Sequence, residues 1–191
     1  CMVRPRGAGF CYTELQKEQM FAEAEELLAH GSDGLAFGFL TEQGEIDLEN
    51  TGRMVKLIHR FGKAAVFHRA FDCVKDPYAA AKQLVELEVD RILTSGQEEK
   101  AWDGIPVLRT LQEQFGSQIE ILAGSGVNAS NARQIMEQTG ISQVHSSCRA
   151  WREDSTTKAG RVSYSFGSQP WESAYDMVSK ELVRKLVELE L

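Results

Sequence analysis

The strict alternation of two kinds of apolar run constrains the fold of this 191-residue chain more than any other feature. Short runs rich in β-branched and aromatic residues alternate with longer runs whose apolar residues recur at helical spacing. The predicted strands start near residues 34, 64, 91, 119 and 143, so successive starts are about 24 to 30 residues apart. That interval fits one strand plus one crossover helix, and it predicts an α/β fold with a parallel sheet.

Local signals mark where the helices between these strands begin. Thr13 with Gln16 fits a capping box, and Asp76 followed by Pro77 fits a helix cap and its first residue. The predicted helices cover residues 13–28, 47–61, 77 onward, 105–115 and 128–139, the last of them capped by Asn128. The predicted strands cover residues 34–39, 64–68, 91–94, 119–123 and 143–145.

Five strands, with a sixth that would end at Met2 and Val3, leave two parallel architectures open. A flavodoxin-like open sheet can use five strands and concentrates its site at one switch point. Polar, small or basic residues follow every predicted strand, which favours a barrel, because the loops of a barrel all meet at one mouth. Because the chain starts within a strand end, we expect that an upstream segment is missing from this sequence.

The composition and the tail bound the remaining possibilities. No break in composition marks a second domain, so the sequence predicts a single domain over residues 1–191. Residues 152–170 are polar and predict a long loop, and residues 171–191 have the apolar spacing of a closing helix. A net charge of −7 without a long basic run argues against nucleic-acid or membrane-surface partners. Without an apolar run of roughly 18 residues or a signal peptide, a cytoplasmic location is expected.

The residues that follow the predicted strands are the best clue to function, since ligands of parallel α/β folds bind beyond the carboxyl ends of the strands. The candidates for ligand or anion binding are Arg4, Arg6, Arg69, Thr94, Ser95, Gly96, Gly124, Ser125, Gly126, Ser146 and Ser147. Arginine matches carboxylate and phosphate groups, and glycine turns before a helix let backbone N–H groups approach an anion. The alternatives are arginines that pair with acidic residues to hold the mouth together, and glycines that serve tight packing.

Three further residues at strand ends are candidates for acid–base chemistry. His68 and His145 end different strands, and Asp72 is within reach to orient an imidazole or to act as a base, so the catalytic candidates are His68, Asp72 and His145. The alternative for each histidine is a buried ring satisfied by hydrogen bonds. Cys73 and Cys148 follow the same two strands and are weak candidates as metal ligands for Cu(I) or zinc. No C-x-x-C pair supports them.

Taken in order, these motifs resemble the CutC family, which is named for copper homeostasis. The residues that carry the resemblance are Arg4-Pro-Arg-Gly7 with Phe10 and Tyr12, His68-Arg-Ala-Phe-Asp72, Leu93-Thr-Ser-Gly96, Gly124-Ser-Gly126 and His145-Ser-Ser147. The resemblance implies a cytosolic TIM (β/α)8-type barrel, often a homodimer, and this chain would lack about its first two βα units. Family cysteines discussed as copper ligands would lie on those two strands, so no copper ligand is assigned here.

Two functions follow as alternatives. The resemblance implies a protein of copper homeostasis, with the copper ion as its ligand. The chemistry of the strand-end residues favours instead an enzyme or a binding protein for a small anion, a phosphorylated or carboxylated metabolite. The sequence leaves the substrate, and whether a reaction is catalysed at all, open.

Overall fold

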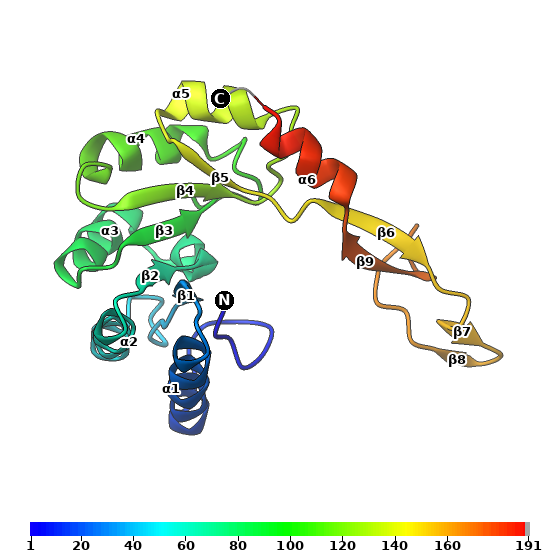
Figure 1. Ribbon diagram of the computed structural model, residues 1–191, viewed down its shortest axis with the longest axis horizontal. Helices are drawn as coiled ribbons and strands as arrows, with labels where there is room; N and C mark the ends of the chain where they lie inside the picture. The colour runs from blue at the N-terminus through cyan, green and yellow to red at the C-terminus, as the bar shows by residue number, and fades with distance from the viewer. Residues whose placement is uncertain (190–191) are drawn as a thin grey trace. The chain divides into compact units, whose positions relative to one another are not determined.

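The computed structural model in Figure 1 describes residues 1–189 of the chain, and these residues divide into two compact units. The larger unit comprises residues 1–127 and 134–145, and the smaller unit comprises residues 128–133 and the chain from residue 146 onward. The sequence predicted one domain over residues 1–191. The chain divides after residue 145 because the next strand leaves the parallel sheet and pairs in an antiparallel sheet of its own.

The larger unit is built on a five-stranded parallel sheet (Figure 1). Its strands are β1 (Gly34–Phe37), β2 (Ala64–Phe67), β3 (Arg91–Thr94), β4 (Glu120–Gly124) and β5 (Gln143–His145). Each strand pairs with its neighbours along the chain, in the order β1-β2-β3-β4-β5, and Met2 forms a parallel bridge to Ala36 beyond β1. This sequential order is that of a (β/α) barrel and contains no switch point. The predicted α/β class and parallel sheet are therefore confirmed.

The helices begin where the local signals predicted, with one exception. The helices of the larger unit are α1 (Glu14–Ala29), α2 (Leu48–Arg60), α3 (Pro77–Glu86) and α4 (Ile105–Phe115). Thr13 and Gln16 form the predicted capping box of α1, and Asp76 Oδ1 accepts the Tyr78 and Ala79 N–H groups at 2.9 and 3.1 Å. The next helix, α5 (Ala132–Thr139), starts four residues later than predicted. Asn128 makes the hydrogen bonds expected of a cap one turn earlier, because its Oδ1 accepts the Ser130 N–H and its carbonyl accepts the Ala132 N–H, both at 2.9 Å.

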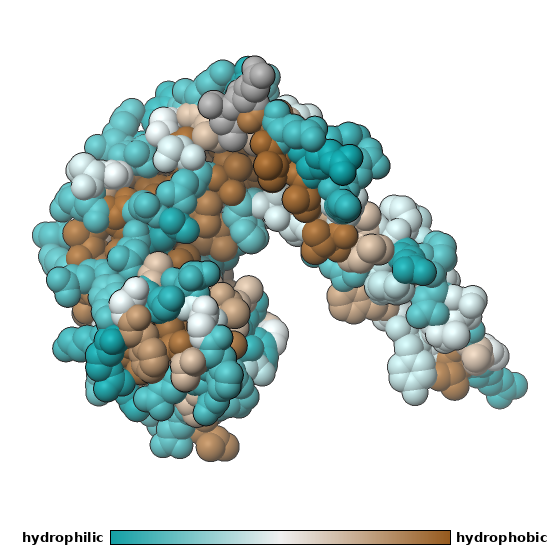
Figure 2. All heavy atoms as spheres, in the orientation of Figure 1, coloured by the Kyte–Doolittle hydropathy of each residue, from teal (hydrophilic) through white to brown (hydrophobic). Residues whose placement is uncertain are grey.

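The two faces of the sheet differ in burial. Alternate residues such as Leu35, Phe37 and Phe67 are fully buried, and Phe21 of α1 stacks on Phe39 at 5.9 Å beside them. The opposite face carries Ala36, Val66, Leu93 and Leu122, which are only half-buried. Figure 2 shows apolar atoms at the surface in the area of β3 to β5. The core of the larger unit therefore lies between the sheet and its helices.

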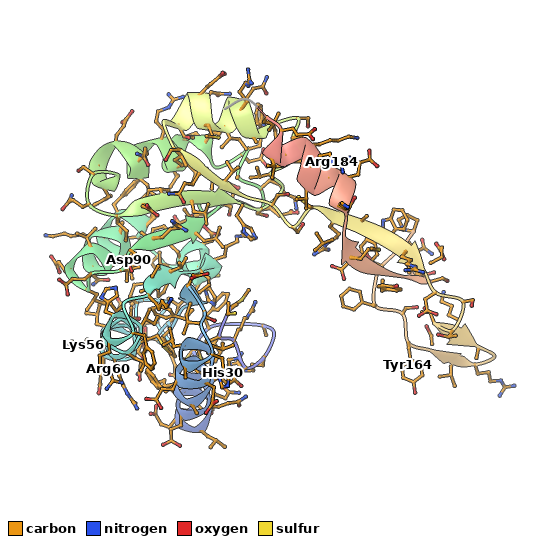
Figure 3. All side chains as sticks on the ribbon, in the orientation of Figure 1. His30, Lys56, Arg60, Asp90, Tyr164 and Arg184 are labelled. Atoms are coloured by element: carbon orange, nitrogen blue, oxygen red, sulfur yellow. The ribbon has the colours of Figure 1, made fainter. Side chains whose placement is uncertain are left out.

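The smaller unit has its own strands and helix. The strand β6 (Arg149–Glu153) pairs antiparallel with β9 (Ala174–Val178), and β7 (Lys158–Ala159) pairs with β8 (Val162–Ser163). Trp151 and Trp171 stack at 5.5 Å, and Tyr164 projects from the end of β8 (Figure 3). The region 152–170 is therefore more than a loop.

The predicted helix over 171–191 is wrong in its first half. Residues Ala174–Val178 form β9, since every residue of this strand has a partner in β6. The helix α6 (Lys180–Val187) begins after Ser179, whose Oγ accepts the Leu182 N–H at 3.3 Å. Residues 190 and 191 of the prediction lie outside the described residues. Among residues 1–189, no helix combines the length and the apolar character that crossing a membrane requires.

Candidate functional site

A buried carboxylate, Asp72, joins the carboxyl ends of β2 and β3. Asp72 lies on the 3-10 helix η1 (Arg69–Cys73), and its side chain is 7% exposed. Its Oδ1 accepts the Thr94 hydroxyl at 2.5 Å and the N–H groups of Ser95 and Gln97 at 3.0 and 3.2 Å. Its Oδ2 accepts Arg69 Nε at 2.7 Å and lies 3.0 Å from the Ser95 hydroxyl. We call these residues, Asp72, Arg69, Thr94, Ser95 and Gln97, the Asp72 cluster.

The polar groups of the Asp72 cluster form hydrogen bonds with one another. Both carboxylate oxygens of Asp72 carry hydrogen bonds, and Thr94 Oγ1 also accepts the Gly96 N–H at 2.9 Å. Arg69 Nη2 donates to Ser95 Oγ at 2.8 Å, so this guanidinium holds two strand ends together. The structure thus places Arg69 in the alternative role that its sequence allowed, an ion pair within the mouth. A carboxylate surrounded by donors in this way suits the positioning of β2 and β3 better than proton abstraction.

His68 immediately follows β2 and is 4% exposed. Its backbone N–H donates to Phe37 of β1 at 2.8 Å, and its Nδ1 accepts the Ala70 N–H at 3.1 Å. The ring packs against Phe10, with 5.1 Å between the ring centroids. Burial lowers the pKa of His68 to about 4, against a smaller opposing effect of a backbone hydrogen bond, and the positive charge of Arg4 adds slightly to the lowering. The imidazole is therefore neutral at physiological pH, which suits a hydrogen-bond donor more than a general acid.

Arg4 and Arg6 belong to one loop that precedes α1, yet they have different surroundings. Arg6 donates to three carbonyl oxygens of its own loop, those of Gly7, Gly9 and Cys11. Arg4 donates to the Ala8 carbonyl at 2.7 Å, and its guanidinium carbon lies 4.8 Å from the centroid of the Phe10 ring. Arg6 therefore orders the loop, whereas the Arg4 guanidinium lies on the aromatic ring that also contacts His68.

The turn Gly124-Ser125-Gly126 follows β4 and is held by packing. A Cβ atom on Gly124 would lie 2.6 Å from Leu93 Cδ1, and Ser125 and Gly126 both have positive φ, at 81° and 71°. The Ser125 hydroxyl donates to the Glu99 carbonyl at 2.6 Å. The sequence offered tight packing as one explanation of these glycines, and the geometry agrees with it at Gly124. Anion binding at this turn stays a prediction.

The remaining candidates belong to both compact units. His145 is exposed at the end of β5, and two strands separate it from His68, a distance of about 14 Å along the sheet for three strand spacings. Cys73 is exposed on η1, and Cys148 is buried in the smaller unit, where its N–H donates to Ser146 Oγ at 3.2 Å. Ser147 is exposed. Within residues 1–189, no group of three or more His, Cys, Asp or Glu side chains is placed to hold a metal ion.

Two hollows of the larger unit lie away from these strand ends. One of them, with a volume of about 770 Å³, opens at the amino ends of β2, β3 and β4 and is lined by charged residues of both signs. The titratable residues that line it are His59, Glu88, Asp90, Arg91 and Glu120. His59 Nε2 lies 2.9 Å from Asp90 Oδ2, and Arg91 Nε donates to Glu120 at 2.6 Å, so four of the five pair with one another. Asp90 is labelled in Figure 3.

Comparison with known proteins gives the chain its family. Residues 1–150 match the CutC family. The chain belongs to the CutC family. A family protein CutC of Treponema denticola is 36% identical over 187 residues, which cover 97% of this chain and 75% of that protein. The human copper homeostasis protein cutC homolog is 37% identical over 176 residues, 92% of this chain and 63% of that protein.

A solved structure agrees with this assignment. The CutC from Streptococcus agalactiae superposes with a TM-score of 0.71 at 34% identity, over 75% of this chain and 70% of that one. A CutC of Glaesserella parasuis is 43% identical over 152 residues and is spanned to 62% of its length. The present chain thus spans about two thirds of the length of its CutC relatives. The predicted resemblance to CutC is confirmed.

Sequence reasoning missed three residues that shape the CutC strand ends. Tyr12, known only as part of the family pattern, is 4% exposed and packs edge-on against Phe39. Gln97 donates to Asp72 through its backbone and to the Val74 carbonyl at 2.5 Å through its side chain. Gly38 leaves the space that the His68 ring fills. For Gly38 alone a signal existed, since it interrupts an apolar strand, and such glycines often mark a close approach.

Proposed function

We propose that this chain forms part of a CutC-family barrel that binds a small organic anion at the carboxyl ends of its strands. One observation carries the proposal: Arg4 and His68, which follow two different strands, both pack against one ring, Phe10. A guanidinium supplies charge and a fork of N–H donors that match a carboxylate or phosphate group. The ligand class is therefore a phosphorylated or carboxylated metabolite.

Titration of the protein with an anion tests this proposal. Calorimetric titration with inorganic phosphate and with acetate, at constant ionic strength set by chloride, is expected to show saturable binding to the wild-type protein. Arg4→Ala is expected to weaken that binding about tenfold, because charge-assisted hydrogen bonds are about twice as strong as neutral ones. Arg60→Ala is the matched control, since Arg60 is an exposed arginine on α2 whose nearest acidic partner, Glu25, lies 3.7 Å away. Absence of saturable binding for both anions would overturn the proposal.

A role in copper homeostasis is a second candidate, and the names of the mouse and human relatives support it. Direct Cu(I) binding asks for soft thiolate or thioether ligands, several of them on one centre. Cys73 and Cys148 belong to different units, and the described residues offer no cluster of metal ligands. The donor set of this chain therefore fits copper poorly, and a copper role for it would be indirect.

A competition experiment separates the two candidates. The reduced protein is titrated with Cu(I) in the presence of a chromogenic Cu(I) chelator, and we expect that the chelator keeps the metal. Withdrawal of copper from the chelator by the wild-type protein, lost in Cys73→Ser or Cys148→Ser, would support direct binding instead. A cytosolic location and a homodimer complete the proposal, on the family resemblance alone. Light scattering coupled to size-exclusion chromatography tests the dimer.

A further inference from the structure

The hydrogen-bond pattern of His68 fixes which of its ring nitrogens carries the proton. A backbone N–H can only donate, so Nδ1, which accepts from Ala70 at 3.1 Å, must be the unprotonated nitrogen of the neutral ring. The proton is then on Nε2. Among residues 1–189 this buried Nε2 has no hydrogen-bond partner, although His68 as a whole is only 4% exposed. His68 therefore presents a buried N–H donor that the described part of the chain does not use.

The hydroxyl of Tyr12 also carries a proton that no residue in 1–189 accepts. The hydroxyl is buried without a hydrogen bond of normal geometry, and the nearby Arg4 guanidinium can only donate to its oxygen. The ring cannot swing away easily, because Phe39 packs against it edge-on at 6.0 Å and the Arg6 guanidinium covers it at 5.0 Å. Leaving a buried polar group unsatisfied costs folding free energy, so such groups are rare and call for an explanation.

Arg4 links the two donors. Its guanidinium packs on Phe10, which also contacts the His68 ring, and the Arg4 charge acts on His68 directly. Its charge is close enough to both side chains to favour the neutral form of His68 and to oppose the rise that burial causes in the pKa of Tyr12. A cationic imidazole beside this guanidinium would be repelled. His68 thus stays a neutral donor next to a permanent positive charge.

From this placement we propose that the Nε2–H of His68 and the hydroxyl of Tyr12 donate hydrogen bonds to the oxygen atoms of a carboxylate or phosphate group drawn in by Arg4. The inference rests on the anion-binding function proposed above and deepens it. It assigns a ligand contact to Tyr12, and it makes His68 a neutral donor in place of a general acid or base. Two neutral donors beside one arginine suit an anionic group with several acceptor oxygens.

An alternative explanation is that the two groups are simply imperfections of packing. Thr51 on α2 provides the comparison, since its hydroxyl is also buried without a partner and Thr51 is 0% exposed. If Tyr12 and His68 are of that kind, their removal will leave anion binding unchanged. Tyr12→Phe deletes only the hydroxyl and keeps the ring. His68→Asn keeps an acceptor for the Ala70 N–H and deletes the Nε2–H donor.

The experiment measures anion affinity and stability together. The dissociation constants for inorganic phosphate and acetate are determined for wild type, Tyr12→Phe, His68→Asn and the control Thr51→Val. We expect about tenfold weaker binding for Tyr12→Phe and His68→Asn and unchanged binding for Thr51→Val, with the melting temperature of Tyr12→Phe equal to or above that of wild type. If the hydroxyl were only an imperfection of packing, Tyr12→Phe would keep its anion affinity, so the affinity decides between the two explanations.

Nitrogen-15 NMR of the histidine ring supplies a readout that needs no mutation. At pH 6.5 the His68 signals should be those of a neutral ring protonated at Nε2, and the Nε2 shift should change when phosphate is added. Wild-type binding that both variants retain would overturn this inference and leave the proposed function standing. Absence of binding to wild type would overturn both. A ring protonated at Nδ1, or cationic at pH 6.5, would overturn the inference alone.

Discussion

Gly38 of the β1 end touches the imidazole of His68 so closely that no side chain fits between them. A Cβ atom on residue 38 would lie 2.7 Å from both Cε1 and Nδ1 of the ring and 2.8 Å from the Ala70 Cβ atom. We therefore predict that Gly38→Ala displaces His68 and destabilises the protein by about 1–3 kcal/mol, the usual cost of overpacking a core. Urea denaturation measures this loss.

The control for this substitution is Gly7→Ala. A Cβ atom at residue 7 would meet nothing within 4 Å, so its stability should match that of wild type. Compared with wild type, anion affinity should be lower in Gly38→Ala and unchanged in Gly7→Ala. Equal stability of the two variants would show that His68 is not held as described.

The Asp72 cluster predicts a large effect from a small chemical change. Asp72→Asn keeps the shape of the side chain but replaces one acceptor oxygen with an NH₂ group that must face donors from Arg69 or Ser95. Because it also leaves a partly buried arginine without its charge partner, we expect a loss of about 3 kcal/mol. Chemical denaturation of the two proteins at pH 7 measures it.

Asp33→Asn serves as the matched control for Asp72→Asn. Asp33 is fully exposed and pairs with Lys63 at 3.7 Å, and such surface pairs contribute little. Its free energy of unfolding should change by no more than about 0.5 kcal/mol. If Asp72→Asn were equally mild, the carboxylate would not be what joins β2 and β3.

The sequence predicted where the strands end. It did not predict which hydrogen bonds and packing contacts the side chains at those ends form. The caps at Thr13 and Asp76 depend on neighbours three residues away, so local sequence contains them. Arg69 was open to two interpretations, ligand contact or an ion pair with Asp72; the 2.7 Å distance between them shows the ion pair, and ligand contact stays a prediction. The burial of Tyr12 depends on Phe39, 27 residues further along the chain, and no local pattern encodes such a contact.

The tail shows the same limit at the level of secondary structure. Met177, Val178, Leu182 and Val183 have spacings that fit a helix, and this pattern predicted one helix over 171–191. Ala174–Val178 is nevertheless a strand because its backbone groups pair with Arg149–Glu153, more than twenty residues earlier. Pairing at that separation overrides local propensity.

The low pKa of His68 predicts a pH dependence of stability with a definite sign. The unfolded chain binds a proton on this residue near pH 6.5, whereas the folded protein does so only near pH 4. Between these values the unfolded state holds more protons, so the contribution of His68 lowers the free energy of unfolding as the pH falls from 6.5 toward 4, by up to about 3 kcal/mol. Above pH 6.5 the effect is absent.

Denaturation curves at pH 7 and pH 4.5 test the sign. His68→Asn has no titrating group at this position, so its loss of stability between the two pH values should be smaller than that of wild type by about 2 kcal/mol. Comparing the two proteins cancels the contribution of the carboxylates they share. Parallel behaviour of wild type and His68→Asn would contradict a neutral, buried His68.

Gly96 and Gly104 bring two turns into direct backbone contact beneath the Asp72 cluster. A Cβ atom on Gly104 would collide with the Ser95 carbonyl, and one on Gly96, where φ is +72°, would collide with the Gly104 carbonyl. The sequence made Gly96 a candidate for ligand binding, which stays a prediction, and this geometry adds a packing role. Gly104→Ala is therefore expected to push Ser95 away from Asp72 and to destabilise the protein by about 2 kcal/mol or more in urea denaturation.

Gly9→Ala, where a Cβ atom meets nothing within 4 Å, is the control, and its free energy of unfolding should equal that of wild type. A Gly104→Ala variant that keeps its stability but binds anions more weakly would show instead that this turn contacts the ligand.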